Sequence, residues 1–284
     1  MHLHGQWKQS TINNQQYVNS SYQPMTNEVA VSSLYDFKNK SHIKSIINNV
    51  SYEIGIKYFQ ELLLRFPDFY DNNKTFLIDL CELNDSIGNP PKIVFKDFTS
   101  CEPTDIRYIF HSALILEQMK TKNINNVNIL EIGGGYGGLS FFLRKIAHLF
   151  DININSYTIY DLKEMSVLQQ KYLEKMEFQT HTYQMDNYHF DYKDYFLISN
   201  YAFSEISLTY QKFYREIIFP LVSSGFILWN HMPLYNFIDK PLLIEKASRV
   251  PDNRLFNHAN GLTPLTNFTL NSNNNWIEEV VVIF

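Results

Sequence analysis

The chain has few of the features that mark several large classes of protein. It contains only two cysteines, Cys81 and Cys101, without the spacing of a metal-binding motif, which fits a reducing compartment. Its formal net charge of -5 gives no basic footprint for nucleic acid. Its most apolar stretch, residues 217–229, is too short to span a bilayer, and residues 1–24 have no apolar core of a signal peptide. We therefore expect a cytoplasmic protein without a nucleic-acid or membrane partner.

What is present supports a large packed core. Hydrophobic residues make up 45% and aromatic residues 15% of the 284 positions, enough for one large domain or for one domain with a cap. Residues 1–28 are rich in Asn, Gln and Ser, and we expect them to be mobile. Residues 29–98 carry apolar side chains at helical spacing and predict a helical cap. Residues 99–284 then form the main domain.

The stretch 128–140 is the centre of this sequence. Ile129, Leu130 and Ile132 suit a strand that is covered on both faces. A glycine-rich turn follows, and residues 139–149 then carry the apolar stripe of a helix. Glycines permit positive φ angles and let a ligand lie against bare backbone at a helix N-terminus. The stretch therefore predicts a nucleotide-type cofactor pocket at the carboxyl edge of a parallel sheet.

Two cofactor patterns match this loop. Gly133, Gly135 and Gly138 satisfy the G-x-G-x-x-G pattern of dinucleotide-binding proteins. Glu131 and Gly137, together with the first two of these glycines, equally satisfy the E-x-G-x-G-x-G pattern of S-adenosylmethionine (SAM) methyltransferases. The spacing alone does not separate SAM from NAD.

Features outside the loop favour SAM. Both patterns need an acid at the end of the next strand to hold ribose hydroxyls, and residues 156–160 supply that strand, followed by Asp161. Glu131 ends the first strand beside the space for a ligand ammonium. The fold begins well inside the chain and closes with strands, not with a large second domain. A further acid, Asp186, follows the third strand-like segment. We favour SAM and keep NAD as the alternative.

Alternating strand and helix patterns predict an α/β, doubly wound, mostly parallel sheet of seven strands with a Rossmann-like architecture. After a strand at 225–231 we expect a helix over 241–248 and a terminal strand pair, 267–270 with 278–284. Ligands bind beyond the carboxyl ends of such strands. The polar residues at those ends are Glu131, Asp161, Asp186, Asn200, Glu205, Asn230 and His231.

A helix over 103–120 precedes the first strand and carries two further candidates, Arg107 and Tyr108. Because the strand starts at Val127, this helix is expected to pass beneath the glycine loop. An arginine there could pair with a cofactor carboxylate or an acceptor phosphate in bidentate fashion. The alternative is an arginine in an ordinary salt bridge on the helix surface.

Several segments resemble the class I SAM-dependent methyltransferases, and among them a family of sugar O-methyltransferases. The similar segments cover roughly residues 102–232. They are T-D-I-R-Y at 104–108, the E-I-G-G-G-Y-G-G loop at 131–138, Y-T-I-Y-D-L at 157–162, L-Q-Q-K-Y-L at 168–173 and S-N-Y-A-F-S-E at 199–205. The loop indicates the superfamily, and the other segments point to the narrower family.

The resemblance implies roles for these residues. Glu131 and the loop would cradle the methionyl part of SAM, Asp161 would hold the ribose, and Asp186 would bind the adenine. The candidate cofactor-binding residues are Arg107, Tyr108, Glu131, Gly133, Gly135, Tyr136, Gly137, Asp161, Leu162, Asp186 and Asn200.

The implied reaction is an in-line methyl transfer from a sulfonium to a hydroxyl of a sugar or nucleotide-sugar, as in glycan biosynthesis. A positioned base would help the hydroxyl lose its proton. His231 is the first candidate and Glu205 the second, the latter also suited to orienting the sugar or binding a cation. The alternative for His231 is a histidine satisfied by local backbone, and His111, in mid-helix, is expected in the core. No metal-ligand spacing is present.

Other functions remain open at this stage. Amine methyltransferases carry prolines after the residue corresponding to Asn200, and here Tyr-Ala-Phe follows. Oxidation with NAD would need a proton relay that we do not find. A methyltransferase-like partner protein without turnover is a third alternative, and a homo-oligomer is compatible with the sequence.

Overall fold

The computed structural model of the protein describes residues 23–184, 190, 192, 194–206, 208–229, 243–250 and 277–284. Its centre is a seven-stranded sheet in the order β5-β4-β3-β6-β7-β9-β8. The strands β5, β4, β3, β6 and β7 pair in parallel, while β9 pairs antiparallel with both β7 and β8. The strands are β3 (Asn126–Ile132), β4 (Asn153–Asp161), β5 (His181–Gln184), β6 (Tyr195–Asn200), β7 (Val222–Trp229), β8 (Leu243–Val250) and β9 (Ile277–Ile283).

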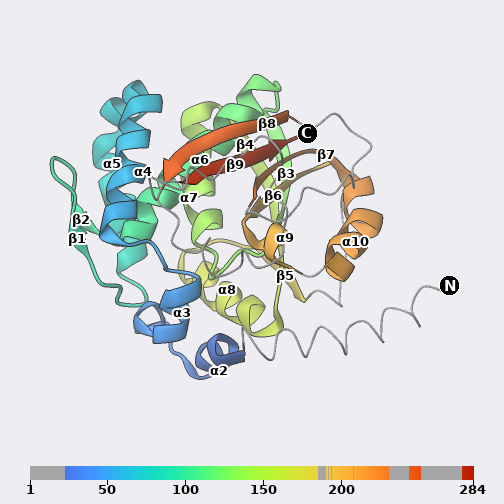
Figure 1. Ribbon diagram of the computed structural model, residues 1–284, viewed down its shortest axis with the longest axis horizontal. Coiled ribbons are helices and arrows are strands. Elements are labelled where there is room, and N and C mark those ends of the chain that lie inside the picture. Colours follow the sequence, from blue (N-terminus) through green and yellow to red (C-terminus); the bar gives the residue numbers. More distant parts are fainter. Residues whose placement is uncertain are drawn as a thin grey trace.

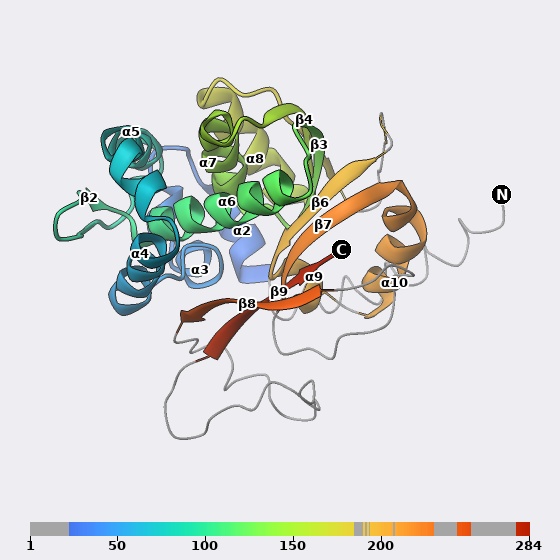
Figure 2. The ribbon, with the colours of Figure 1, turned by 90° about the horizontal axis from the view of Figure 1, so that it is seen from above.

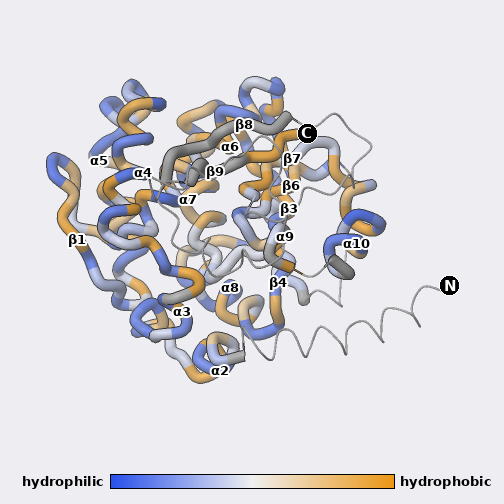
Figure 3. The backbone as a smooth tube through the Cα atoms, in the orientation of Figure 1, coloured by the Kyte–Doolittle hydropathy of each residue, from blue (hydrophilic) through white to orange (hydrophobic). Residues whose placement is uncertain are grey.

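Helices cover both faces of this sheet, which confirms the predicted doubly wound, mostly parallel α/β fold (Figures 1 and 2). On one face Ile129 packs with residues of α6, α7 and α8, and on the other Leu130 packs with residues of α9 and α10. Because side chains alternate along a strand, every central strand must be apolar on both sides, and the tube of Figure 3 is largely orange there. The helices are α6 (Pro103–Thr121), α7 (Gly138–Ile146), α8 (Lys163–Lys175), α9 (Ala202–Glu205) and α10 (Leu208–Ile217).

The N-terminal region is helical, as its apolar spacing predicts. A proline starts α5 directly after α4, since Pro67 occupies a first-turn position where it loses no hydrogen bond. A short hairpin of β1 (Ile93–Val94) and β2 (Ser100–Cys101) then leads into α6. The remaining elements are α2 (Gln23–Val31), η1 (Phe37–Asn39), α3 (Ser41–Ile46), α4 (Tyr52–Arg65) and α5 (Pro67–Asp85).

The first helix begins earlier than the polar composition suggests. Residues 23–28, which we expected to be mobile, belong to α2. Met25 and Val29 lie one turn apart and are both buried, because this helix packs against α3 and α8. Residues 1–22 lie outside the described part of the chain. Among the described helices, none has the length and apolar character required to cross a bilayer.

One expectation near the C-terminus is wrong. We expected a helix over 241–248, but residues 243–250 form strand β8, and β9 pairs with both β8 and β7. The expected partner at 267–270 lies outside the described residues. A segment such as L-I-E-K-A-S-R-V suits either state locally, and the strand pairing available at the sheet edge decides. After β6 the chain forms the two helices α9 and α10.

Candidate functional site

The strand order reverses at β3, which lies between β4 and β6. In open α/β sheets, ligands bind beyond the carboxyl ends of the strands at such a point. The loops after β3 and β6 touch there, because a Cβ added to Gly133 would lie 2.0 Å from Cβ of Ala202. Ser199 joins the same two strand ends, since its hydroxyl donates to the carbonyl of Ile132 at 2.8 Å and accepts from Phe203 N at 2.9 Å. The candidate site is therefore the pair of loops at this edge.

The glycine loop has the backbone that the sequence predicts. Gly133, Gly135 and Gly137 have φ values of +74°, +56° and +99°, in the left-handed region that favours glycine. Gly137 is the N-cap of α7, so the loop leads directly into a helix N-terminus with unpaired backbone N–H groups. This backbone favours a negatively polarised ligand group.

Asp161 ends β4 and lies beside the loop. Its carboxylate accepts hydrogen bonds from Leu162 N and from Nε2 of Gln169, both at 2.8 Å. The same Gln169 amide donates to the carbonyl of Gly135 at 2.7 Å. Burial raises the pKa of Asp161 to about 6, although hydrogen bonds from Leu162, Gln169, Gly134 and Gly135 favour its charged form. An acid is thus held against the loop backbone.

The part played by Gln169 is missing from the sequence-based predictions. It lies on α8, is fully buried, and joins the loop to the acid. Its one sequence signal was its place in the L-Q-Q-K-Y-L segment shared with the resembling family. Polarity alone gave no reason to select it from the many amides of this chain.

Glu131 lies beneath the loop, on the face of the sheet that carries α7. Its Oε2 accepts the hydroxyl of Tyr157 at 2.9 Å and lies 3.1 Å from the position of a Cβ on Gly134. Burial raises the pKa of Glu131 to about 8, and the neighbouring charge of Asp161 adds to this effect. We expected Glu131 beside a ligand ammonium, and the structure places it below the backbone that such a ligand would contact.

Tyr108 contacts the glycine loop, whereas Arg107 binds a different segment. Tyr108 packs against the loop, since a Cβ on Gly138 would lie 2.4 Å from Cε2 of that ring. Arg107 instead donates from Nη2 to the carbonyl of Ile47 at 3.0 Å and from Nη1 to Oδ1 of Asn49 at 3.1 Å. The arginine is buried and holds the segment that follows α3.

That segment covers the glycine loop. Cγ2 of Ile47 lies 3.1 Å from the position of a Cβ on Gly135. Its attachment depends on Arg107, so Arg107→Ala should release residues 41–50 and speed tryptic cleavage after the exposed Lys44 by about thirtyfold, if each of the two bonds contributes about 1 kcal/mol. Timed digestion with mass spectrometry measures this rate. The exposed Arg215 on α10 provides a control, Arg215→Ala, and equal cleavage rates in the two variants would contradict the attachment.

The ring of Tyr136 points away from the loop into the helical layer. It is fully buried and makes an edge contact with Tyr172 at 4.9 Å between ring centroids. Its hydroxyl accepts from Nδ2 of Asn84 at 3.2 Å. This side chain therefore anchors the loop, and only its backbone is placed to face a ligand.

A buried polar cluster lies behind Tyr136. Nζ of Lys38 donates to the carbonyl of Asn84 at 2.9 Å and lies 3.5 Å from Oε2 of Glu102. Nδ2 of Asn84 donates to Oδ1 of Asp105 at 2.6 Å. Burial raises the pKa of Glu102 to about 7 and that of Asp105 well above its ordinary value, and Asp85 adds to both. The cluster thus joins η1, α5 and α6 beneath the loop.

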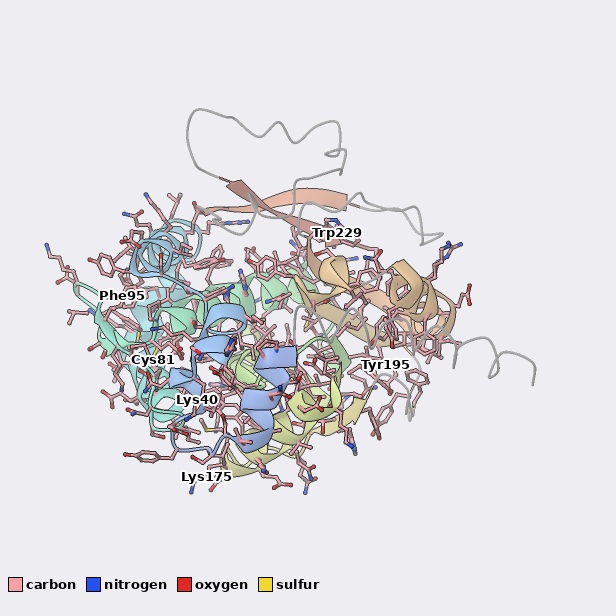
Figure 4. The ribbon with its side chains drawn as sticks, turned by 60° about the horizontal axis from the view of Figure 1, so that its bottom comes forward. Lys40, Cys81, Phe95, Lys175, Tyr195 and Trp229 are labelled. Atoms are coloured by element: carbon pink, nitrogen blue, oxygen red, sulfur yellow. The ribbon has the colours of Figure 1, made fainter. Side chains whose placement is uncertain are left out.

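Two side-chain groups in the described part of the chain are close enough to hold a metal ion. Cys81, Cys101 and Asp105 form one, and Asp85, Glu102 and Asp105 the other, with ligand atoms within 4.8 Å of one another in each. Sequence spacing did not indicate them, because three separate elements bring them together. Figure 4 shows Cys81 in the N-terminal helical region. Both cysteines are free thiols, and Lys38 already supplies a positive charge to this cluster.

A second polar group lies at the end of β6. Nδ2 of Asn200 donates to Nδ1 of His111 at 3.1 Å. The hydroxyls of Tyr58 and Tyr201 are 3.2 Å apart, and the ring of Tyr58 meets His111 edge-on at 5.4 Å. His111 is buried as expected, yet it also orients a predicted site residue.

Several buried amides near this edge have polar atoms that no described residue satisfies. They are Oε1 of Gln169, Oδ1 of Asn200, and both Oδ1 and Nδ2 of Asn48. Buried polar groups in folded proteins are nearly always hydrogen-bonded. Unpaired amides around a glycine loop therefore indicate a place where a polar ligand would supply the missing partners.

Some predicted site residues cannot be placed. Asp186, Asn230 and His231 lie outside the described residues. The backbone of Glu205 ends α9, while its side chain lies outside the described part. Their roles stay predictions.

Comparisons with known proteins show similarity at the level of structure. No protein-family model and no curated protein sequence matches the chain. It is similar to a SAM-dependent methyltransferase from Clostridium acetobutylicum, with 13% identity, a TM-score of 0.37, and 51% of this chain and 63% of that chain covered. It is also similar to a candidate RNA methyltransferase from Pyrococcus horikoshii, with 13% identity and a TM-score of 0.38, and this match covers 61% of this chain and 81% of that chain. A third similar structure is the amino pentose methyltransferase CalS10 from Micromonospora echinaspora, solved with SAM bound. Its identity is 12% and its TM-score 0.35, and the match covers 50% of this chain and 58% of that chain.

The identities and TM-scores of these matches are low. The chain spans less than two thirds of the length of the first of these structures. With identities of 12–13% and TM-scores of 0.35–0.38, none of the three supports a substrate or a residue role. The fold is assigned from the strand order and the two helical layers of this chain itself.

Proposed function

We propose that this protein is a SAM-dependent methyltransferase. One observation carries the proposal: a left-handed glycine loop at a helix N-terminus, with Asp161 held against it from the end of the next strand. The loop presents backbone N–H groups, and the carboxylate lies one strand away. Together they suit a ligand with an adenosine part and a charged end. The amide oxygens of Gln169 and Asn200, which lack partners among the described residues, fit the same ligand.

The residues of this chain would bind and align the two reactants. Asp161 would accept the ribose hydroxyls, and the loop from Gly133 to Gly137 would support the methionyl part from below. Glu131 would help the loop to cradle the methionyl part, with its carboxyl group fixed by the hydroxyl of Tyr157 on β4. When bound, SAM supplies an activated methyl group, so the protein contributes alignment and exclusion of water.

For the acceptor we propose a hydroxyl of a sugar or nucleotide-sugar. The resemblance of the segments around 104–108 and 199–205 to sugar O-methyltransferases supports this choice. His231 remains the proposed base and Glu205 the proposed second group. NAD is the alternative cofactor, because a site formed by two loops where the strand order reverses is also suited to NAD.

A ligand comparison followed by a transfer assay tests the proposal. S-adenosylhomocysteine should raise the melting temperature of the protein and NAD should not. Labelled SAM should then transfer its methyl group to at least one member of a nucleotide-sugar panel.

The matched variants are Asp161→Ala, at the site, and Asp79→Ala, an exposed acid on α5. The first should lose the ligand-induced shift and the transfer, whereas the second should keep both. A shift with NAD alone would replace the proposal by an oxidoreductase. A shift with S-adenosylhomocysteine but no transfer to any sugar would retain the cofactor and reject the acceptor.

A further inference from the structure

The amide of Asn48 is the most conspicuous unsatisfied group of the described chain. The residue is only 4% exposed, and neither Oδ1 nor Nδ2 has a hydrogen-bond partner among the described residues. Its own backbone N–H is used within α3 and its cap, at 3.4 Å from the carbonyl of Ile43. Leaving a buried amide unpaired costs about 1–3 kcal/mol, so a purely structural role would favour an apolar residue here.

The neighbours of Asn48 in the chain fix its place. Ile47 lies against Gly135, the middle glycine of the loop. Asn49 accepts from Arg107, which also binds the carbonyl of Ile47. Two hydrogen bonds from one buried arginine thus hold the residues on either side of Asn48. The backbone at Asn48 is therefore fixed over the glycine loop although its amide binds nothing described.

We infer that Asn48 binds the amino-acid end of the cofactor, an inference that rests on the proposed function. That end carries an ammonium and a carboxylate on one carbon. A primary amide offers both complementary groups, since Nδ2 donates to a carboxylate and Oδ1 accepts from an ammonium. A neutral amide also adds no charge to a site that already contains the carboxyl group of Asp161.

The inference gives Arg107 a different role from the one the sequence suggested. We expected its guanidinium to pair with a ligand carboxylate, but its Nη1 and Nη2 donate hydrogen bonds to Asn49 and Ile47. Arg107 is then a positioning residue, which holds the amide that makes the contact.

The test compares two ligands on the full chain by calorimetry. S-adenosylhomocysteine carries the amino-acid end, and 5′-methylthioadenosine lacks it while sharing the adenosine and the sulfur. The variant is Asn48→Leu, which keeps the branched shape at Cγ and removes both polar atoms. Its control is Asn72→Leu, at an exposed position of α5.

Asn48→Leu should weaken the affinity for S-adenosylhomocysteine by about tenfold or more, because hydrogen bonds to charged groups are lost. Its affinity for 5′-methylthioadenosine should stay within about twofold of the wild-type value. The ligand-free variant should melt at or above the wild-type temperature, since an unpaired buried amide is gone. Asn72→Leu should bind both ligands like the wild type.

Equal affinity of Asn48→Leu and wild type for S-adenosylhomocysteine would overturn the inference, and so would an equal loss for both ligands. Either result leaves the proposed function standing. If the wild type binds neither ligand, the proposed function fails and the inference fails with it. A variant that melts well below the wild type would assign Asn48 a structural role and reject the inference.

Discussion

Gly133→Ala should destabilise the protein by about 2–5 kcal/mol and abolish binding of S-adenosylhomocysteine. The backbone at this glycine has a φ of +74°, where a side chain costs about 1–2 kcal/mol. The new Cβ would also lie 2.0 Å from Cβ of Ala202, which forces the loops after β3 and β6 apart at about 1–3 kcal/mol. Urea unfolding followed by circular dichroism measures the first effect, and calorimetry measures the second.

Two further variants separate strain from crowding. Gly135→Ala has a φ of +56° and places its Cβ 3.1 Å from a flexible Ile47 side chain, so it should lose only about 1–2 kcal/mol. In the double variant Gly133→Ala with Ala202→Gly the clash is removed, and about half of the lost stability should return. Equal effects at Gly133 and Gly135, with no rescue, would contradict the close approach of the two loops.

Stability should fall as the pH rises from about 5 to about 8. Burial raises the pKa of Glu131 to about 8 and that of Glu102 to about 7 in the folded protein, whereas both titrate near 4.5 when unfolded. In this interval the unfolded chain has lost these protons and the folded chain still holds them, so each group removes up to about 1.4 kcal/mol of stability per pH unit. Urea unfolding at several pH values gives the slope.

Glu131→Gln assigns part of that slope to one residue. The amide cannot titrate, and its Oε1 can still accept the hydroxyl of Tyr157. The variant should therefore lose less stability between pH 5 and pH 8 than the wild type. Glu82→Gln, at an exposed position of α5, should keep the wild-type slope. A wild-type stability that rises over this interval would refute the burial of neutral acids.

Local patterns were sufficient for the centre of the fold. The apolar run at β3, the glycines after it and the amphipathic α7 each carry their own signal, and Asp161 was placed at the end of β4 by counting from one strand to the next. Such elements depend on periodicity and turn chemistry, which a single sequence contains. The edge of the sheet was different, because β8 is a strand only through its pairing with β9.

The candidate site was predicted where residues follow strands, and missed where they come from helices. The sequence placed Asp161 and the glycine loop at the same edge of the sheet, but it did not indicate the contacts of Gln169 and His111 or the unpaired amide of Asn48. Each of these depends on a side chain that reaches another element. Arg107 was selected as a candidate from the sequence, but its partners lie in a segment distant in sequence, and only the folded chain shows them.

Calorimetric titration of the wild-type protein with S-adenosylhomocysteine tests the central claim most directly. We expect saturable binding at one site per chain, with no heat from NAD under the same conditions. Absence of heat with both S-adenosylhomocysteine and SAM, or saturable binding of NAD instead, would contradict a methyl-donor site at the loop between β3 and α7.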